Sequence, residues 1–263
     1  MKKFLTIFIL LLLSGIPLIS CLDVYADNIP DFVKKEAYEI LNDPAYIGKS
    51  VTAKVNVDQN GNYIKHEIEI ENPERYAMSK AAVAAAADDF YNRYIEGKIP
   101  EGSEDWRFKR EMEIIKFMVS NIDYAAARRN ANANIDEDFS AYGALINHEA
   151  VCDGYTKCFN VLAKRCGLES IKVAGNGHSW NIVKLDDGNY YHVDVSWEDP
   201  TIDGQPNKIY GYDKLLNNYI NLTSEKIKAI GGQSHSSWDD TTHECNSDIY
   251  GTDKVNRYFQ GIK

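Results

Sequence analysis

The first part of the chain combines one helical and two strand-like patterns of apolar residues. Apolar positions at helical spacing predict a helix over residues 31–41, which ends before Pro44. Residues 51–57 and 64–70 alternate with period two, and the segment 58–61 between them is typical of a hairpin turn. A solvated face of the second strand is indicated by its charged outward positions, Lys65, Glu67, Glu69 and Glu71.

Two further helices are predicted in the middle of the chain. An alanine-rich run predicts a helix over residues 78–95, and a second helix is predicted over residues 105–122. The expected buried stripe of the second helix is Trp106, Met112, Ile115, Val119 and Ile122, with Phe117 at its flank. Residues 124–140 are polar and predict a loop, although 125–127 allow an extension of the preceding helix.

One helix followed by three strands is predicted between residues 152 and 197. Apolar side chains at helical spacing predict a helix over residues 152–166, and Gly167 supplies its C-terminal stop. Strand-forming runs follow at residues 170–174, 178–185 and 189–197. A helix packed against a meander of strands is an α+β arrangement, and we predict that fold class.

The first 26 residues are predicted to be a secretory signal peptide. Two lysines precede an apolar run over residues 4–13, which is then broken by a glycine and a proline. The run is shorter than the about 20 apolar residues of a membrane-spanning helix. Cleavage after Ala26 fits this segment, and so does a lipobox in which a lipid on Cys21 tethers the chain to the membrane. Either site predicts an exported protein, secreted or held at the cell surface.

Length and charge narrow the picture further. The 263 residues divide into the signal peptide 1–26, a helix and hairpin region 27–75, and a main domain 76–263 that is long enough for a buried core. There are 39 acidic and 29 basic side chains, a net charge of −10, which becomes −11 without residues 1–26. This balance argues against nucleic acid as a partner, because phosphate contacts need clustered Lys and Arg.

The cysteine spacing argues against a disulfide framework. Beyond the signal peptide the cysteines are Cys152, Cys158, Cys166 and Cys245. Cys152 and Cys166 lie about 21 Å apart along the predicted helix, which is too far for a bridge. Cys158 and Cys166 fit its apolar stripe as small core residues. The spacing lacks a zinc signature, and no calcium loop or phosphate-binding glycine loop occurs, so no metal or cofactor is expected.

Cys152 stands where a thiol becomes reactive. It begins the predicted helix, precedes the apolar stripe and is followed by Asp153 and Gly154. The unpaired amides and the dipole of a helix N-terminus favour the thiolate, which is the nucleophilic form. A thiolate mechanism also needs a base and a group that orients the base.

His178 and Asp194 are predicted to approach each other across a hairpin. A three-residue loop that ends at Gly188 sets a register in which Asp194 lies opposite Trp180. His178 is then a diagonal neighbour of Asp194, close enough for its imidazole to reach the carboxylate. His192 has the same parity and also lies near Asp194, so spacing alone leaves both histidines open as the base.

Three segments occur in a characteristic order: Ala150-Val-Cys-Asp-Gly-Tyr155, Gly177-His-Ser-Trp-Asn181 and Tyr191-His-Val-Asp-Val-Ser-Trp-Glu-Asp-Pro200. Together they resemble the motifs of the bacterial transglutaminase-like superfamily. Ser140-Ala-Tyr-Gly-Ala-Leu145 upstream, and residues 219–225 with Cys245-Asn246 downstream, extend the resemblance over residues 104–246. Residues 27–75 resemble no family that we can name.

The resemblance implies a fold and a set of catalytic residues. The fold is a papain-like transglutaminase core, in which a nucleophile helix packs on an antiparallel sheet. Cys152 is the implied nucleophile, His178 the base and Asp194 the residue that orients the imidazole. His178 is implied in place of His192 because the base of the family lies in a His-x-Trp-Asn motif. The residues assigned to the site wall and its support are Trp180, Asn181, Tyr142 and Trp197.

The implied activity is acyl transfer from an amide bond, of a Gln side chain or a peptide, through a thioester. The Cys152 backbone N–H would hold the oxyanion together with a second donor, for which Tyr142 and Tyr124 are candidates. The expected partners are protein or peptide substrates, cell-wall peptide included. Two alternatives stay open: a thiol peptidase or amidase of the same fold, and a non-catalytic binding or scaffold domain of the cell envelope.

Overall fold

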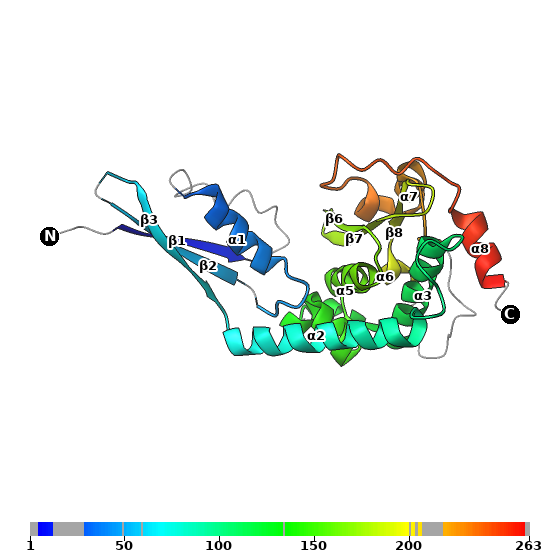
Figure 1. Cartoon of the computed structure of the whole chain (residues 1–263), viewed down its shortest axis with the longest axis horizontal. Helices are drawn as coiled ribbons and strands as arrows, with labels where there is room; N and C mark the ends of the chain where they lie inside the picture. The colour runs from blue at the N-terminus through cyan, green and yellow to red at the C-terminus, as the bar shows by residue number, and fades with distance from the viewer. Residues whose placement is uncertain are drawn as a thin grey trace. The chain divides into compact units, whose positions relative to one another are not determined.

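The computed structural model describes residues 5–12, 29–48, 50–58, 60–133, 135–199, 201–202, 205–206 and 218–260. The chain divides into two compact units, Met1–Lys80 and Ala81–Lys263 (Figure 1). The division falls within helix α2 (Pro73–Tyr94), shortly after residue 75, where the N-terminal region was predicted to end. In the described part of the chain, no helix has both the length and the apolar character needed to cross a bilayer.

The N-terminal unit packs one helix on an antiparallel sheet of order β1-β2-β3. Its elements are β1 (Leu5–Leu12), α1 (Asp31–Leu41), β2 (Ser50–Val57) and β3 (Tyr63–Ile70). The predicted helix and hairpin are therefore confirmed. Alternate residues of β2 and one face of α1 form the core, with Val33, Ala37, Leu41, Val51, Ala53, Val55 and Val57 all at most 3% exposed. The charged outward positions of β3 are exposed, as predicted.

Strand β1 covers part of the predicted signal peptide. Its eight residues pair antiparallel with β2 along its whole length. The two processing positions, Cys21 and Ala26, lie outside the described residues. The signal peptide, the lipid anchor and export therefore stay predictions.

The C-terminal unit contains the predicted helix and meander. The strands β6 (Ser170–Gly175), β7 (His178–Lys184) and β8 (Tyr190–Val193) form an antiparallel sheet in that order, and α5 (Cys152–Arg165) packs against β7 (Figure 1). The hairpin register is as predicted, because Ile182 pairs with His192. The loop also has the expected left-handed glycine, Gly188, at φ 79°. The structure thus mixes helices with small antiparallel sheets, which is compatible with the predicted α+β class.

Successive residues of β7 face two different layers. Asn181 faces α5, where its Nδ2 donates to the carbonyl of Thr156 at 3.2 Å. Trp180 and Ile182 face the other way, toward α7 (Ser224–Ile230), in a core that also contains Val173, Leu222, Ile227 and Cys245. Cys245, for which the sequence suggested no role, is therefore a buried core residue.

Helix boundaries and helix burial correct two predictions. Helix α2 begins at Pro73 and not at residue 78, because the fixed φ and missing N–H of proline suit the first turn of a helix. Helix α3 (Trp106–Asn121) lies where it was predicted, but Val119 is only half-buried. The stripe is wider than predicted because the helix is covered on more than one side, and it includes Phe108, Ile114 and Met118.

The predicted loop over residues 124–140 contains regular elements. These are β4 (Asp123–Tyr124), α4 (Ala126–Asn130) and a 3₁₀ turn at Asp136–Phe139. β4 pairs in parallel with β5 (Glu149–Ala150), directly before α5. A two-residue strand is too short to leave a periodic pattern. The remaining elements are a π turn at Gly143–Asn147, α6 (Val195–Glu198), β9 (Thr201–Ile202), β10 (Gln205–Pro206), a 3₁₀ turn at Gly232–His235 and α8 (Thr252–Gln260).

The third strand of the meander is shorter than predicted. β8 ends at Val193, and Asp194 caps α6 by accepting a hydrogen bond from the Trp197 backbone N–H at 3.2 Å. A carboxylate that satisfies a free N–H at a helix start favours helix over strand. The prediction of strand over residues 194–197 is therefore wrong, and Asp194 lies at the junction of β8 and α6.

Helix α3 buries an acidic side chain, Glu111, beside Asn221. The Asn221 amide donates to Glu111 Oε2 at 2.9 Å, whereas Glu111 Oε1 and Asn221 Oδ1 are buried without a partner among the described residues. Burial and the charge of Asp186 raise the pKa of Glu111 to about 8, against the effect of the Asn221 bond. Protonation of Glu111 would add a second donor to this buried pair.

Glu111 should make the stability of the fold depend on pH. Its folded pKa lies above the ordinary value of 4.5, so the stabilisation is complete below about pH 4.5 and is lost as the pH rises toward 8. Glu111→Gln keeps the shape and adds a permanent donor, and should raise the unfolding free energy at pH 8 by about 1–3 kcal/mol. Denaturant midpoints at several pH values test this. Glu113→Gln, half-buried on the same helix, should keep the wild-type pH slope; an unchanged slope in Glu111→Gln would contradict the assignment.

Candidate active site

Cys152 is the first residue of α5 and the most accessible of the described cysteines. Its exposure is 9%, against 0% for Cys158, Cys166 and Cys245, and all four thiols are free. The helix start is closely packed: a Cβ added to Gly154 would lie 2.5 Å from the Asp138 carbonyl oxygen. The packing leaves room only for glycine at this position of the first helical turn.

The surroundings of Cys152 favour its thiolate. Burial by itself would raise the pKa of the thiol, but the hydrogen bond with His178 and the charge of that imidazole bring the pKa below its ordinary value of 9.0. The charge of Asp153 opposes this lowering, and the backbone N–H of Ser179 adds to it. Asp153 is itself paired with Lys157 at 2.9 Å, which limits its repulsion of the thiolate.

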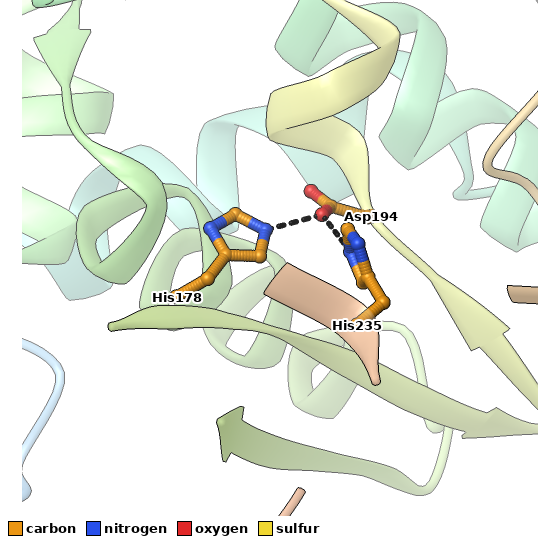
Figure 2. Close-up of side chains that lie close together, drawn as sticks. All are labelled: His178, Asp194 and His235. Carbon is orange, nitrogen blue, oxygen red and sulfur yellow. Dashed lines mark hydrogen bonds and ion pairs between the residues drawn. The ribbon is translucent and has the colours of Figure 1, made fainter. Parts of the chain in front are cut away.

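His178 begins β7 and connects Cys152 to Asp194. Its Nε2 lies 2.5 Å from Asp194 Oδ2 (Figure 2), so Nδ1 is the nitrogen left to the thiol. Burial would lower the pKa of His178, but the hydrogen bonds with Asp194 and Cys152 and their charges raise it to about 9. The histidine therefore takes the imidazolium form at neutral pH, beside a thiol whose pKa is lowered.

Both oxygens of the buried Asp194 carboxylate are fully used. Oδ1 accepts from Ser196 Oγ at 2.7 Å and from the Trp197 backbone N–H at 3.2 Å. Oδ2 lies against both His178 and His235 (Figure 2). Burial would raise the pKa of Asp194, but the hydrogen bonds from the two histidines and the charge of His178 lower it to about 2. Asp194 is therefore an anion whose Oδ2 lies within hydrogen-bond distance of both imidazoles.

His235 is a site residue that the sequence analysis missed. It lies in the Gly232–His235 turn, is fully buried, and places Nε2 at 2.9 Å from Asp194 Oδ2. The two residues are 41 positions apart, and no periodic pattern connects them. Only its residue type, one of six histidines, marked it in the sequence.

The indole rings of Trp180 and Trp197 line the histidine. Their ring centroids lie 5.8 Å and 5.6 Å from that of His178. Asn181 lies on the other face of β7 and supports α5 through its bonds with Thr156 and Asn160. The structure thus places both tryptophans at the site and Asn181 behind it.

His192 lies beside the site without entering the Asp194 network. It is fully buried, and its Nδ1 accepts from Trp180 Nε1 at 3.0 Å while Nε2 lies 3.2 Å from Ser224 Oγ. Burial, and then the charges of His235 and Lys228, lower the pKa of His192 to about 3. His192 is therefore a neutral ring that supports Trp180.

Of the two tyrosines considered as oxyanion donors, Tyr124 lies at the thiol. Burial and the charge of Cys152 raise the pKa of Tyr124 to about 12, while Arg129 and the Cys152 backbone N–H act in the opposite direction. The pairing of β4 with β5 brings Tyr124 beside Ala150, two residues before the thiol. Tyr142 is half-buried, and no hydrogen bond within the described residues joins it to Cys152 or to Asp194.

His178, Asp194 and His235 are residue types that can ligate a metal ion, and they lie close together. One ligand atom of each lies within 4.8 Å of the others. Ligands of a tetrahedral zinc ion stand about 3.3 Å apart, given bonds of about 2.0–2.1 Å. The contacts of 2.5 Å and 2.9 Å to Asp194 Oδ2 are shorter than this, and they match hydrogen bonds between ring N–H groups and a carboxylate.

Comparisons with known proteins add little to this geometry. No protein-family model matches the chain, and no curated protein matches it. A solved structure described as "Crystal structure of a TGase" is similar over 54% of this chain and 38% of that chain, with a TM-score of 0.35 and 14% identity. This chain therefore spans less than half of the length of that protein. A likeness at this level hints at a transglutaminase-like fold and establishes neither a family nor an activity.

Proposed function

We propose that this chain is a cysteine acyl-transfer enzyme with a papain-like, transglutaminase-like core. Cys152 is the nucleophile, His178 the base and Asp194 the orienting group. One observation carries the proposal: a thiol at a helix start, 9% exposed, is hydrogen-bonded to a histidine whose other nitrogen lies 2.5 Å from a buried carboxylate. A packing role for Cys152 requires none of these polar contacts. None of the three other described thiols is hydrogen-bonded to a histidine that is paired with a carboxylate.

The proposed reaction begins with attack of the Cys152 thiolate on an amide carbonyl carbon. The carbon–sulfur bond forms and the carbonyl oxygen becomes an oxyanion. The oxyanion then collapses, the carbon–nitrogen bond breaks, and the His178 imidazolium gives its proton to the departing nitrogen, which leaves a thioester on Cys152. An amine or a water molecule attacks the thioester, His178 takes its proton, and the thiolate is restored. Asp194 holds the imidazole in position through both halves of the cycle.

Tyr124 is the second oxyanion donor that we propose, beside the Cys152 backbone N–H. Its hydroxyl lies at that N–H, and its high pKa keeps the phenol protonated and able to donate. The hydroxyl also accepts a hydrogen bond from Arg129, which strengthens it as a donor. A substrate carbonyl oxygen that displaces the Tyr124 oxygen from the Cys152 N–H would meet both donors.

The proposed substrates are amides of proteins and peptides encountered after export. Gln side chains are the substrates of a transfer reaction, and peptide bonds, including those of cell-wall peptide, are the substrates of a peptidase or amidase. Which acceptor takes the acyl group depends on how well the bound substrate excludes water from the thioester. The exported location follows from the predicted signal peptide.

A labelled primary amine offered with a Gln peptide tests the proposal. Wild-type protein should incorporate the amine and release ammonia, and Cys152→Ala should do neither. Cys158→Ala, which changes a buried thiol on the same helix, is the matched control and should remain active. Ammonia release without incorporation of the amine would mean that the site catalyses hydrolysis and not transfer. Absence of both reactions with a broad set of peptides, together with an unreactive Cys152, would favour the scaffold alternative and contradict the proposal.

A further inference from the structure

Both ring nitrogens of His235 face hydrogen-bond acceptors. Nδ1 lies 3.1 Å from the carbonyl oxygen of Gly231, and Nε2 lies 2.9 Å from Asp194 Oδ2. A carbonyl oxygen has no hydrogen to donate, and neither has the ionised Asp194 carboxylate. Each nitrogen of His235 must therefore carry a hydrogen, which is the imidazolium form.

The surroundings of His235 suit a cation. Its ring centroid lies 4.6 Å from that of Trp180, 4.7 Å from that of Trp197 and 5.8 Å from that of Tyr219. Aromatic faces attract a positive charge, and the attraction is stronger at a desolvated site. The negative charge of Asp194 attracts the ring, although it is shared with the imidazolium of His178, whose ring centroid lies 5.0 Å away. The side chain is fully buried, so no solvent competes for these contacts.

The backbone that carries His235 is tied to the turn that carries His178. Asn176, between β6 and β7, donates from Nδ2 to the Gln233 carbonyl and to Ser236 Oγ, both at 2.9 Å. A Cβ added to Gly175 would lie 1.9 Å from the Ser237 carbonyl oxygen, so glycine permits this close approach. The two histidines that share Asp194 are thus held by backbones in direct contact.

We infer that His235 is a positioning residue of the proposed active site, an imidazolium that holds Asp194 Oδ2 in place for His178. The inference rests on the proposed function. His235 does not reach the reacting atoms, and it acts through the carboxylate. Without it Oδ2 keeps His178 as its one donor, and the carboxylate loses one of the contacts that limit its movement around the imidazole. The working unit is then a thiol, two histidines and one shared carboxylate.

Three variants separate this role from packing. His235→Phe fills the aromatic cluster and removes both donors, whereas His235→Gln retains an amide N–H that can reach Asp194. His192→Gln is the matched control, because His192 is an equally buried ring that touches Trp180 and not Asp194. We expect His235→Phe to slow both alkylation of Cys152 and kcat by about tenfold or more, with KM unchanged. His235→Gln should recover most of that loss, and His192→Gln should stay near wild type.

The protonation state is tested independently of catalysis. The ¹⁵N imidazole signals of His235 in wild-type protein at pH 7 should show two protonated nitrogens, and a neutral ring would overturn the inference. So would a folded His235→Phe with wild-type alkylation rate and kcat. If His235→Phe does not fold, the nitrogen signals and His235→Gln still decide the question. Failure of the proposed function looks different, because wild-type Cys152 would then be unreactive before any substitution.

Discussion

Iodoacetamide at pH 6 is expected to label Cys152 at least about 100-fold faster than any other described cysteine of the folded protein. An ordinary thiol of pKa about 8.5 is well under one per cent ionised at this pH. The His178 hydrogen bond and charge, acting against burial, lower the pKa of Cys152. Burial raises the pKa of Cys166 and of Cys245 to about 12, and raises that of Cys158 further.

Peptide mapping after timed labelling measures the four rates separately. The rate at Cys152 should fall at a pH below the pKa of its thiol, where the thiolate takes up a proton. It should change again near pH 9, where His178 loses its proton. In concentrated guanidinium the four thiols should react alike, because the fold no longer distinguishes them. Equal rates in the folded protein would mean that Cys152 is not activated.

His178→Gln is expected to lower acyl transfer by about 1000-fold, whereas His192→Gln should change it by less than about threefold. His178 alone is bonded to both the thiol and Asp194. The imidazole of His192 accepts from Trp180 and has a pKa of about 3, so it is neutral at working pH. Its loss disturbs packing but no step of proton transfer.

The two variants form a matched pair, since both remove a buried histidine from the same sheet. Initial rates of amine incorporation give the comparison, and thermal unfolding of each variant shows whether the fold is retained. A large loss in His192→Gln with little effect in His178→Gln would mean that the base is His192. Similar losses in both, with similar destabilisation, would mean that packing and not chemistry accounts for them.

Local patterns were enough to predict that His178 and His192 both lie near Asp194, whereas the choice of His178 came from the motif resemblance. The hairpin between β7 and β8 is closed by a three-residue loop, and a loop of given length determines the register of the strands that it joins. Register in turn determines which side chains share a face, and the observed pairing of Ile182 with His192 matches the predicted one. The helix that begins at Cys152 could also be predicted from local patterns, because its apolar residues have helical spacing and Gly167 stops the helix.

Competition between short-range interactions limited prediction at the ends of elements. Residues 189–197 look like one strand, yet the Asp194 side chain bonds to the Trp197 backbone N–H and turns the chain into α6. Propensity cannot anticipate this outcome, because it depends on a single capping interaction. β4 was not predicted for a related reason: its two residues form a strand only because β5 lies beside them.

The sequence by itself determined the order of α5 and the three strands that follow it, and the register of the β7–β8 hairpin. It also marked Cys152, His178 and Asp194 as candidate site residues. Only the tertiary structure brought His235 to Asp194 and Tyr124 to Cys152. These contacts join segments far apart in the chain, and they depend on close backbone approaches with no periodic signature. Periodicity reports which face of an element is buried, whereas the partner of a buried polar group is decided when the elements pack.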